Sequence, residues 1–436
     1  MRRSLVARAL VTMSLIVVGQ GHLLAQDKPQ TGTSSIAAAA QQPQTLDDTM
    51  EAGEAEAKEP ARSLVKWNHY EGQFFSIRLG GGVLLDYATY AQDANSQQQF
   101  DLTPEFKVRD ARMLLKGRLK FKRQVTWSTG LMYDGPSGKW LVRETGIMVD
   151  VPEIWGNIFV GRSKEGFSLN KVMVGYAGWT MERATINDAT IPILADGIKW
   201  LGYVPRKRLL WNLGFYGDAI SVGQSFSTYR NQVAGRVAWL PLMSADGGRL
   251  LHVGVSGRVG KPKDDTLQLR SRPEAFPAPY FLDTGKFAAT STTMIGTEVY
   301  YRPGPFLFGT EYFVQKADAP QSGNPLFHGG DVVATWLVTG ETRSYNTRGG
   351  FFNQISPART VFQGGPGAWE IVARFSYTDL DSQAIHGGTF WRLTPMVNWY
   401  LSDHLRLEMA YGYGSLDRFG LVGKTQFFQS RLQVQL

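Results

Sequence analysis

The chain has 436 residues, a formal net charge of +8 and no cysteine, which excludes disulfide scaffolds, thiol nucleophiles and cysteine metal sites. Its 46 Lys and Arg residues are spread along the sequence instead of being clustered with aromatic residues, so nucleic-acid binding is disfavoured. The six histidines show no ligand spacing, so neither a metal site nor a cofactor is expected.

Residues 1–25 have the features of a secretory signal peptide. Arg2 and Arg3 supply positive charge, residues 9–18 are apolar, and Ala25 offers a small residue at a cleavage position. This run is too short for a transmembrane helix, and no later stretch approaches roughly 18 uninterrupted apolar residues. The sequence therefore indicates an exported chain that is either soluble or a membrane barrel.

Residues 26–66 have a different composition, rich first in Ala, Gln, Pro, Thr and Ser and then in acidic residues. We expect a disordered, acidic periplasmic segment. Removing the three arginines of residues 1–25 and the net charge of −5 carried by residues 26–60 leaves +10 on the remainder. For an exported chain, this positive charge favours small anions as partners.

Residues 110–121 alternate between basic and apolar side chains. Arg112, Lys116, Arg118 and Lys120 fall on even positions, and apolar residues occupy most odd ones. Because successive side chains of a strand point to opposite faces, this segment predicts a strand with one cationic and one apolar face. Such a strand suits a membrane barrel, whose wall faces lipid with one residue and the lumen with the next.

The alternation recurs and predicts that residues 67–436 form an all-β, transmembrane antiparallel β-barrel of about 16 strands. The predicted strands are 74–88, 108–121, 124–133, 140–150, 154–161, 197–204, 208–217, 230–240, 250–260, 292–302, 306–316, 331–339, 369–379, 391–401, 404–413 and 424–436. Lys or Arg facing lipid at the bilayer midplane costs about 2–4 kcal/mol, so the basic residues should face inward. Besides the four above, the expected pore-lining residues are Arg78, Arg236, Arg258, Arg374, Arg406 and Arg431.

Four connections between these strands are long. Residues 261–291, 317–330 and 340–368 are expected on one side, as external loops, because such barrels have short periplasmic turns. Residues 162–196 are unusually apolar for a loop. We expect this last connection to fold into the lumen as a constriction.

Four stretches, in the same order along the chain, resemble the phosphate-selective porin O and P family. They are Gly166-Phe167-Ser168-Leu169 through Thr180-Met181-Glu182-Arg183, Arg270-Ser271-Arg272-Pro273-Glu274 with Asp283-Thr284-Gly285, Gly365-Pro366-Gly367-Ala368-Trp369-Glu370, and Asn398-Trp399-Tyr400-Leu401. The resemblance implies a homotrimer of sixteen-stranded barrels in the outer membrane of a Gram-negative-type bacterium, surrounded by its lipid. It also implies anion conduction past arginines and lysines to a constriction loop.

Carried over by position, the resemblance makes Arg183 a phosphate ligand in the constriction loop and Arg112 a wall arginine facing it. Where the family commonly has a Thr-Ser-Ser run, this chain has Met173-Val174-Gly175. Phosphate preference is therefore open, and Lys171 is expected to replace part of the lost binding. The alternative for Arg183 is a salt bridge to Glu182 or a role as loop anchor.

These observations predict a porin for passive diffusion of small anions, phosphate-like or polyphosphate-like, and not an enzyme. Two alternatives stay open. One is a non-conducting structural or adhesive barrel, in which the same charges form buried salt bridges. The other is an outer-membrane barrel enzyme, which needs a nucleophile beside a general base, and the sequence contains no Gly-x-Ser-x-Gly elbow to provide one.

Overall fold

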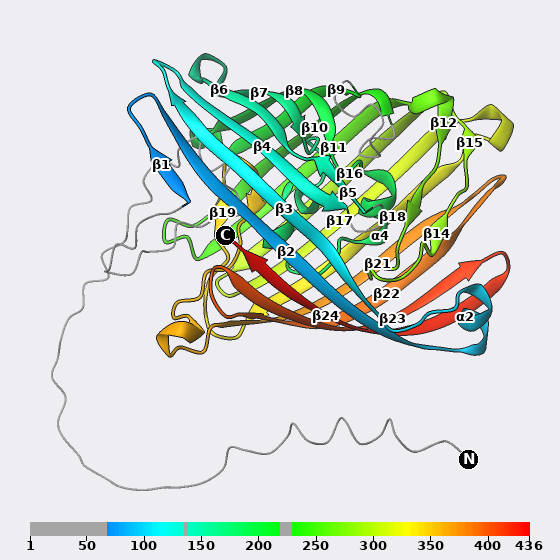
Figure 1. The fold of residues 1–436 in the computed structure, drawn as a ribbon. Helices are drawn as coiled ribbons and strands as arrows, with labels where there is room; N and C mark the ends of the chain where they lie inside the picture. Colours follow the sequence, from blue (N-terminus) through cyan, green and yellow to red (C-terminus); the bar gives the residue numbers. More distant parts are fainter. Residues whose placement is uncertain (1–67, 135–137, 219–228) are drawn as a thin grey trace, which may run out of the picture. The chain divides into compact units, whose positions relative to one another are not determined.

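A computed structural model describes residues 68–134, 138–218 and 229–436, which form a closed β-barrel (Figure 1). The predicted signal peptide and acidic segment, residues 1–25 and 26–66, lie outside the described residues. Across the described residues, every helix is too short or too polar to cross a membrane.

Sixteen antiparallel strands make the wall, which confirms the predicted fold class. In chain order they are β2 (Phe75–Gln92), β3 (Glu105–Lys120), β4 (Gln124–Asp134), β5 (Lys139–Val142) with β6 (Thr145–Val151), β7 (Gly156–Ser163), β8 (Ala195–Val204), β9 (Leu209–Gly217), β10 (Tyr229–Met243), β11 (Arg249–Pro262), β16 (Ser291–Pro303), β17 (Phe306–Asp318), β18 (Leu326–Leu337), β21 (Ala368–Ser382), β22 (Ile385–Tyr400), β23 (Leu405–Arg418) and β24 (Leu421–Gln435). β5 and β6 both pair with β4 and share one place in the wall. The ring closes because β2 pairs with both β3 and β24.

The remaining elements are short. The small strands are β1 (His69–Glu71), β12 (Thr266–Leu267), β13 (Arg270–Ser271), β14 (Leu282–Asp283), β15 (Phe287–Ala288), β19 (Tyr345–Asn346) and β20 (Phe351–Phe352). The α-helices are α2 (Ala94–Gln99), α3 (Leu169–Val172) and α4 (Thr185–Thr190). The 3-10 turns are η1 (Pro152–Ile154), η2 (Gly175–Ala177), η3 (Pro205–Lys207), η4 (Lys263–Asp265), η5 (Pro320–Ser322) and η6 (Val361–Gln363).

The two faces of the wall differ as the alternation predicts. On β10, Val233 and Trp239 are more than half exposed, whereas Arg236 between them is 1% exposed. Because outward side chains have nothing beside them in a single barrel, their exposure marks the lipid-facing side. The apolar residues of the alternation therefore face outward, and the basic residues face inward.

The long connections do not all leave the barrel at one end, which corrects one prediction. Residues 164–194 and 263–290 follow β7 and β11 at one end of the barrel. Residues 338–367 follow β18, which runs the other way, so they lie at the opposite end, where the C-terminus is found (Figure 1). Residues 319–325 form only a short turn, because β17 and β18 both extend further than the alternation indicated.

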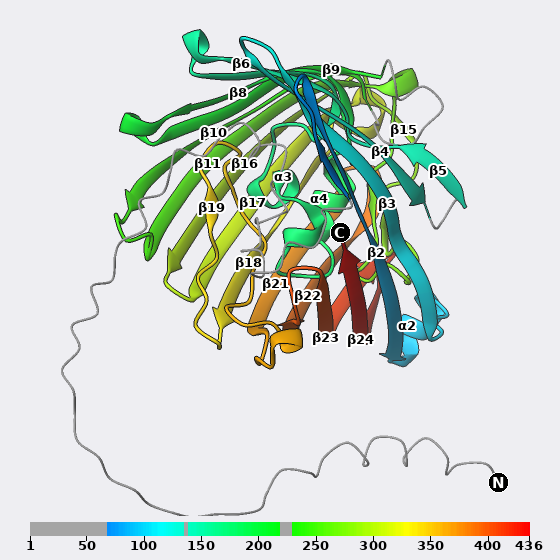
Figure 2. The same cartoon turned by 60° about the vertical axis from the view of Figure 1, so that its left-hand side comes forward.

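Three connections fold into the lumen. We call residues 164–194 the constriction loop, residues 263–290 the companion loop and residues 338–367 the opposite-end loop. Figure 2 shows α3 and α4 of the constriction loop inside the ring of strands, as predicted. Trp179 of this loop packs against Tyr300 of the wall and Phe352 of the opposite-end loop, with ring centroids 5.6 and 6.2 Å apart.

The constriction loop lies against only part of the wall. Ser168 Oγ donates to Glu311 on β17 at 2.6 Å, and the Leu169 N–H donates to Glu298 on β16 at 2.7 Å. On the far side, Asn398 of β22 donates to the Trp179 carbonyl at 2.9 Å. These contacts hold the constriction loop against β16, β17 and β22.

Candidate anion-conducting site

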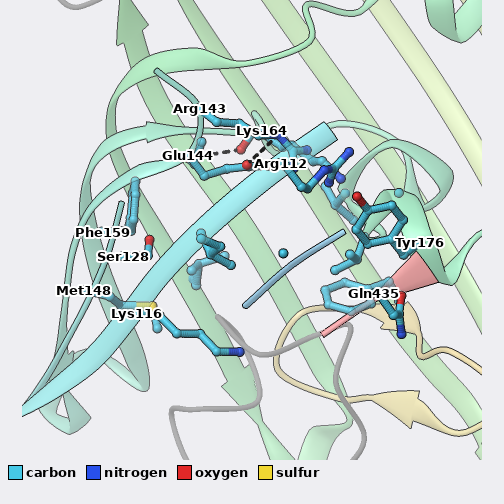
Figure 3. Close-up of a pocket in the computed structure, with 18 of the residues that line it drawn as sticks. Arg112, Lys116, Ser128, Arg143, Glu144, Met148, Phe159, Lys164, Tyr176 and Gln435 are labelled. Atoms are coloured by element: carbon cyan, nitrogen blue, oxygen red, sulfur yellow. Dashed lines mark hydrogen bonds and ion pairs between the residues drawn. The ribbon is translucent and has the colours of Figure 1, made fainter. Parts of the chain in front are cut away.

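A cavity of about 210 Å³ lies between the constriction loop and the wall formed by β3 to β8 (Figure 3). Its lining comes from seven strands and two inward loops. The lining residues are Gly81, Arg112, Leu114, Lys116, Ser128, Arg143, Glu144, Met148, Phe159, Ser163, Lys164, Val172, Val174, Gly175, Tyr176, Lys199, Leu201, Phe351, Gln435 and Leu436. Five of the lining side chains are cationic and one is acidic, so the cavity has a strong positive excess.

The cations are held by nearby carboxylates and aromatic rings. Arg112 forms an ion pair with Asp110 and lies over the Tyr176 ring, 4.3 Å from its centroid. Arg143 pairs with Glu144 at 3.0 Å. The Lys199 ammonium lies 5.0 Å from the centre of the Phe159 ring. Cation–π contacts of this kind orient a cation without neutralising it.

Tyr176 is positioned by a close approach between the constriction loop and the wall. A Cβ on Gly82 of β2 would come within 2.8 Å of the Tyr176 hydroxyl, so only glycine leaves room for this ring. Gln433 of β24 donates to the Tyr176 carbonyl at 3.2 Å. The two contacts hold η2 beside the cavity.

Lys164, directly after β7, brings a cation to the loop side of the cavity. Its Nζ donates to the Met173 carbonyl at 2.6 Å. Desolvation by the surrounding loop, followed by repulsion from Arg183, lowers the pKa of Lys164 well below its ordinary value. An anion beside this ammonium would favour its charged form.

Of the expected pore-lining residues, Arg112 and Lys116 line the cavity. Arg78 lies opposite Lys116 in the β2–β3 register. Arg118 and Lys120 are exposed further along β3, and Lys120 pairs with Glu71 at 2.5 Å. These five residues share the inward face of β2 and β3.

Five other arginines, which we expected to line water, are buried and anchor the inward loops instead. All five are at most 4% exposed: Arg236, Arg258, Arg374, Arg406 and Arg431. Their loop partners are the Gly350 carbonyl for Arg236, Glu165 for Arg258, Glu274 for Arg374, the Gly178 carbonyl for Arg406 and Glu182 for Arg431. These side chains point into the barrel, as the alternation predicts. The inward loops fill the space where we expected solvent.

The two loop residues also differ from expectation. Lys171 is buried, its Nζ donates to the Ile191 carbonyl at 2.9 Å, and burial followed by repulsion from Arg183 lowers its pKa to about 7. Arg183 donates to the carbonyls of Asn170 at 2.9 Å and Met173 at 3.1 Å. Glu182 pairs instead with Arg109 at 2.7 Å and Arg431 at 2.5 Å. Arg183 therefore binds the loop backbone and shares the Met173 carbonyl with Lys164, as the anchoring alternative expects.

Three cations of the cavity were missed from the sequence: Arg143, Lys164 and Lys199. Lys199 lies within a predicted strand, and its neighbour Ile198 is exposed on the outward face, so the parity rule could have found it. Arg143 lies inside the predicted strand 140–150, but the structure divides that segment into β5 and β6 with Arg143 between them. Lys164 lies beyond the end of β7, where strand alternation gives no direction. Within residues 68–134, 138–218 and 229–436, no group of three or more His, Asp or Glu side chains could hold a metal ion.

A closed barrel with a loop folded into its lumen is the architecture of an outer-membrane porin. The chain belongs to the phosphate-selective porin O and P family, whose sequence profile matches residues 77–436. This membership places the protein in the outer membrane of a Gram-negative-type bacterium.

Individual relatives match over part of the chain. Porin O of Pseudomonas aeruginosa is 23% identical over 203 residues, which cover 40% of this chain and 45% of that protein. An uncharacterized protein of Caulobacter vibrioides is 28% identical over 182 residues, covering 41% of this chain and 36% of that one. The chain thus spans less than half the length of the curated relatives it matches.

Solved structures share the fold at low sequence identity. The anion-selective porin from Comamonas acidovorans is 14% identical, with a TM-score of 0.52 over 83% of this chain and 100% of that one. Salmonella typhi OmpF, in complex with daunomycin, is 11% identical, with a TM-score of 0.54 over 84% of this chain and 100% of that one. At these identities the likeness establishes the barrel fold.

Proposed function

We propose that this protein is a passive, anion-selective porin whose selective region is the cavity between the constriction loop and β3 to β8. The observation that carries the proposal is the charge of the lining side chains, five cationic against one acidic. In a narrow passage with low-dielectric walls, like charges concentrate the opposite ion and repel their own kind. Rings of Arg or Lys serve this purpose in anion pores.

The ion pairs of the cavity do not remove this selectivity. Glu144 is the one acidic side chain of the lining and pairs with Arg143. Asp110 is 2% exposed and pairs with Arg112. Of the three other lining cations, Lys164 and Lys199 donate to the carbonyls of Met173 and Lys164, and these acceptors carry no negative charge to oppose that of an ammonium.

The sign of the reversal potential in a planar bilayer under a KCl gradient tests the proposal. We expect a potential that reports chloride as the more permeant ion. The double variant Arg143→Met/Lys199→Met should lower the chloride preference. Its matched control is Arg206→Met/Lys207→Met, which removes the same charges from the exposed turn η3 and should behave as wild type. A wild-type channel that prefers potassium contradicts the proposal.

The buried anchors favour a second candidate, a barrel plugged by its own loops. Arg258 with Glu165 and Arg343 with Glu370 form fully buried ion pairs, as a permanently filled lumen would contain. This candidate expects no current steps from folded protein in the same bilayers. Chloride-selective steps decide against it.

The assembly we propose is a homotrimer. A Vibrio cholerae OmpT structure described as a trimer form shares the fold, with a TM-score of 0.51 over 84% of this chain. Mass measurement of the detergent-solubilised protein by native mass spectrometry tests the stoichiometry. A monomer as the main species would contradict the trimer and leave the channel proposal standing.

A further inference from the structure

The cationic cavity is also strongly apolar, which is unusual for a passage that serves a bare inorganic ion. Among the side chains that line it are Leu114, Met148, Phe159, Val172, Val174 and Leu201. Figure 3 shows Arg112, Arg143, Glu144 and Lys164 gathered on one side, with Phe159, Met148 and Lys116 on another and Tyr176 across the space. The cavity therefore combines a cluster of charged groups with apolar surface, and Lys116 and Lys199 add cations on the apolar side.

Among the constriction-loop residues of the lining, Tyr176 alone carries a hydroxyl, so the loop side offers few uncharged donors to a strongly hydrated anion. An inorganic anion enters a narrow site when donors replace the water that it loses. Val172, Val174 and Gly175 carry no hydroxyl or amide side chain, and the side chains of the two valines contribute only apolar surface. The cations attract an anion, and burial of an apolar group against these walls adds a favourable free energy when the anion carries such a group.

The volume of the cavity indicates the size of the apolar group that it can hold. An apolar cavity of about 150 Å³ accommodates a molecule the size of benzene. The 210 Å³ of this cavity therefore suits one ring together with a carboxylate or sulfonate. Phe159 and Tyr176 offer aromatic surfaces to such a ring, although each already lies against a cation.

We propose that this cavity favours small organic anions that carry a single apolar ring, such as aromatic carboxylates and sulfonates, over inorganic phosphate. The proposal rests on the proposed anion-selective porin function and assigns its substrate class. The charged group would lie toward Arg112, Arg143 and Lys164. The ring would lie toward Met148, Phe159, Val172 and Val174.

Block of the chloride current in planar bilayers tests this preference, with benzoate, acetate and inorganic phosphate as the probes. In wild type we expect benzoate to reduce the current at a concentration at least about tenfold below that needed for phosphate or acetate, because acetate has the same charged group but no ring. Equal or stronger block by phosphate overturns the substrate class. A cation-selective channel overturns the porin proposal instead, so the two failures are distinguishable.

A loop variant tests whether the apolar wall is the cause. Val174→Ser/Gly175→Ser adds two hydroxyls and removes apolar surface. It should be accommodated, because a Cβ on Gly175 meets only the Arg112 side chain, at 3.9 Å. We expect the benzoate-to-phosphate ratio to fall severalfold toward unity. The control Ile193→Ser makes a similar change at an exposed position of the same loop, outside the cavity lining, and should keep the wild-type ratio.

Calorimetric titration of benzoate and phosphate into the detergent-solubilised wild-type protein decides the preference independently of folding or conductance in the variants. Tighter benzoate binding supports the proposal, and tighter phosphate binding contradicts it. An unchanged ratio in a folded Val174→Ser/Gly175→Ser variant also contradicts it.

Discussion

The Lys164 ammonium and the Arg183 guanidinium donate to one acceptor, the backbone carbonyl of Met173, at 2.6 and 3.1 Å. Two cations are thereby held close together at the edge of the cavity. Because like charges repel, Arg183 adds to the desolvation that lowers the pKa of Lys164. If the cavity conducts anions as proposed, this pair would make its charge depend on pH.

We predict that the chloride preference of the wild-type channel declines as pH rises. A lysine is charged below its pKa and neutral above it, and the pKa of Lys164 is lowered, so its charge is lost well below the ordinary value of about 10.4. Reversal potentials between about pH 6 and pH 10 measure this decline. Lys164→Met should show a lower chloride preference at neutral pH, by a few-fold, and a flatter pH profile. Lys207→Met on the exposed turn η3 is the control and should titrate as wild type.

Removing Arg183 should move this titration upward. Without the neighbouring positive charge, the pKa of Lys164 rises, and the channel keeps its chloride preference to higher pH in Arg183→Met. Arg183→Lys keeps the charge but loses the double contact to the loop carbonyls, so its midpoint should stay near that of wild type. A phosphate ligand would behave differently. If Arg183→Met abolishes phosphate block without shifting the pH midpoint, the anchoring role is wrong.

The ion pair between Arg258 and Glu165 should stabilise the folded barrel strongly against loss of one partner. Both side chains are buried, and Arg258 also donates to the Thr190 carbonyl and the Tyr229 hydroxyl. Leaving a buried charge without its partner costs about 3–5 kcal/mol, so Arg258→Met should lower the free energy of unfolding by this order. Urea unfolding followed by tryptophan fluorescence measures it. The double variant Arg258→Met/Glu165→Gln should recover part of the loss, and a single variant as stable as wild type would contradict the anchor.

Gly350 should be needed to seat the opposite-end loop. Its φ is +70°, and a Cβ there would meet Leu210 at 2.6 Å and Arg236 at 2.7 Å. Gly350→Val should therefore displace the loop from the lumen, raise the single-channel conductance and lower the free energy of unfolding by about 1–3 kcal/mol. Gly340→Val also has a positive φ but no neighbour within 4 Å of its Cβ, so it separates backbone strain from the clash. Equal effects of the two variants would show that strain alone is responsible.

Much of the wall could be predicted from the sequence, because a strand in lipid must alternate. On β10 the alternation of Val233, Arg236 and Trp239 defines both the strand and its two faces. β18 was predicted to start at residue 331 but begins at Leu326, since Gly329 and Gly330 interrupt the apolar pattern without interrupting the pairing. Because glycine has no side chain, the alternation cannot show whether a strand continues through it.

The lumen could not be predicted in the same way. Parity shows that Arg374 faces inward, but its partner Glu274 is 100 residues away in the companion loop. The same is true of Arg258, whose partner Glu165 is 93 residues away. The alternation along a strand predicts which way a side chain points, but it does not predict which loop residue contacts that side chain. Ion-paired arginines that hold a loop and cations that face a conducting channel therefore have the same sequence pattern. The apolar composition of residues 162–196 located the constriction loop, and the family resemblance assigned Lys171 and Arg183 to the passage. In the structure both side chains donate to backbone carbonyls of that loop.

Arg431 has a consequence for how the protein reaches its membrane. It lies on the last strand and pairs with Asp86 on the first barrel strand at 2.6 Å and with Glu182 of the constriction loop at 2.5 Å. One guanidinium therefore spans the seam of the ring and the element inside it. We expect sealing of that seam and seating of the loop to be coupled during biogenesis, because both use the same side chain.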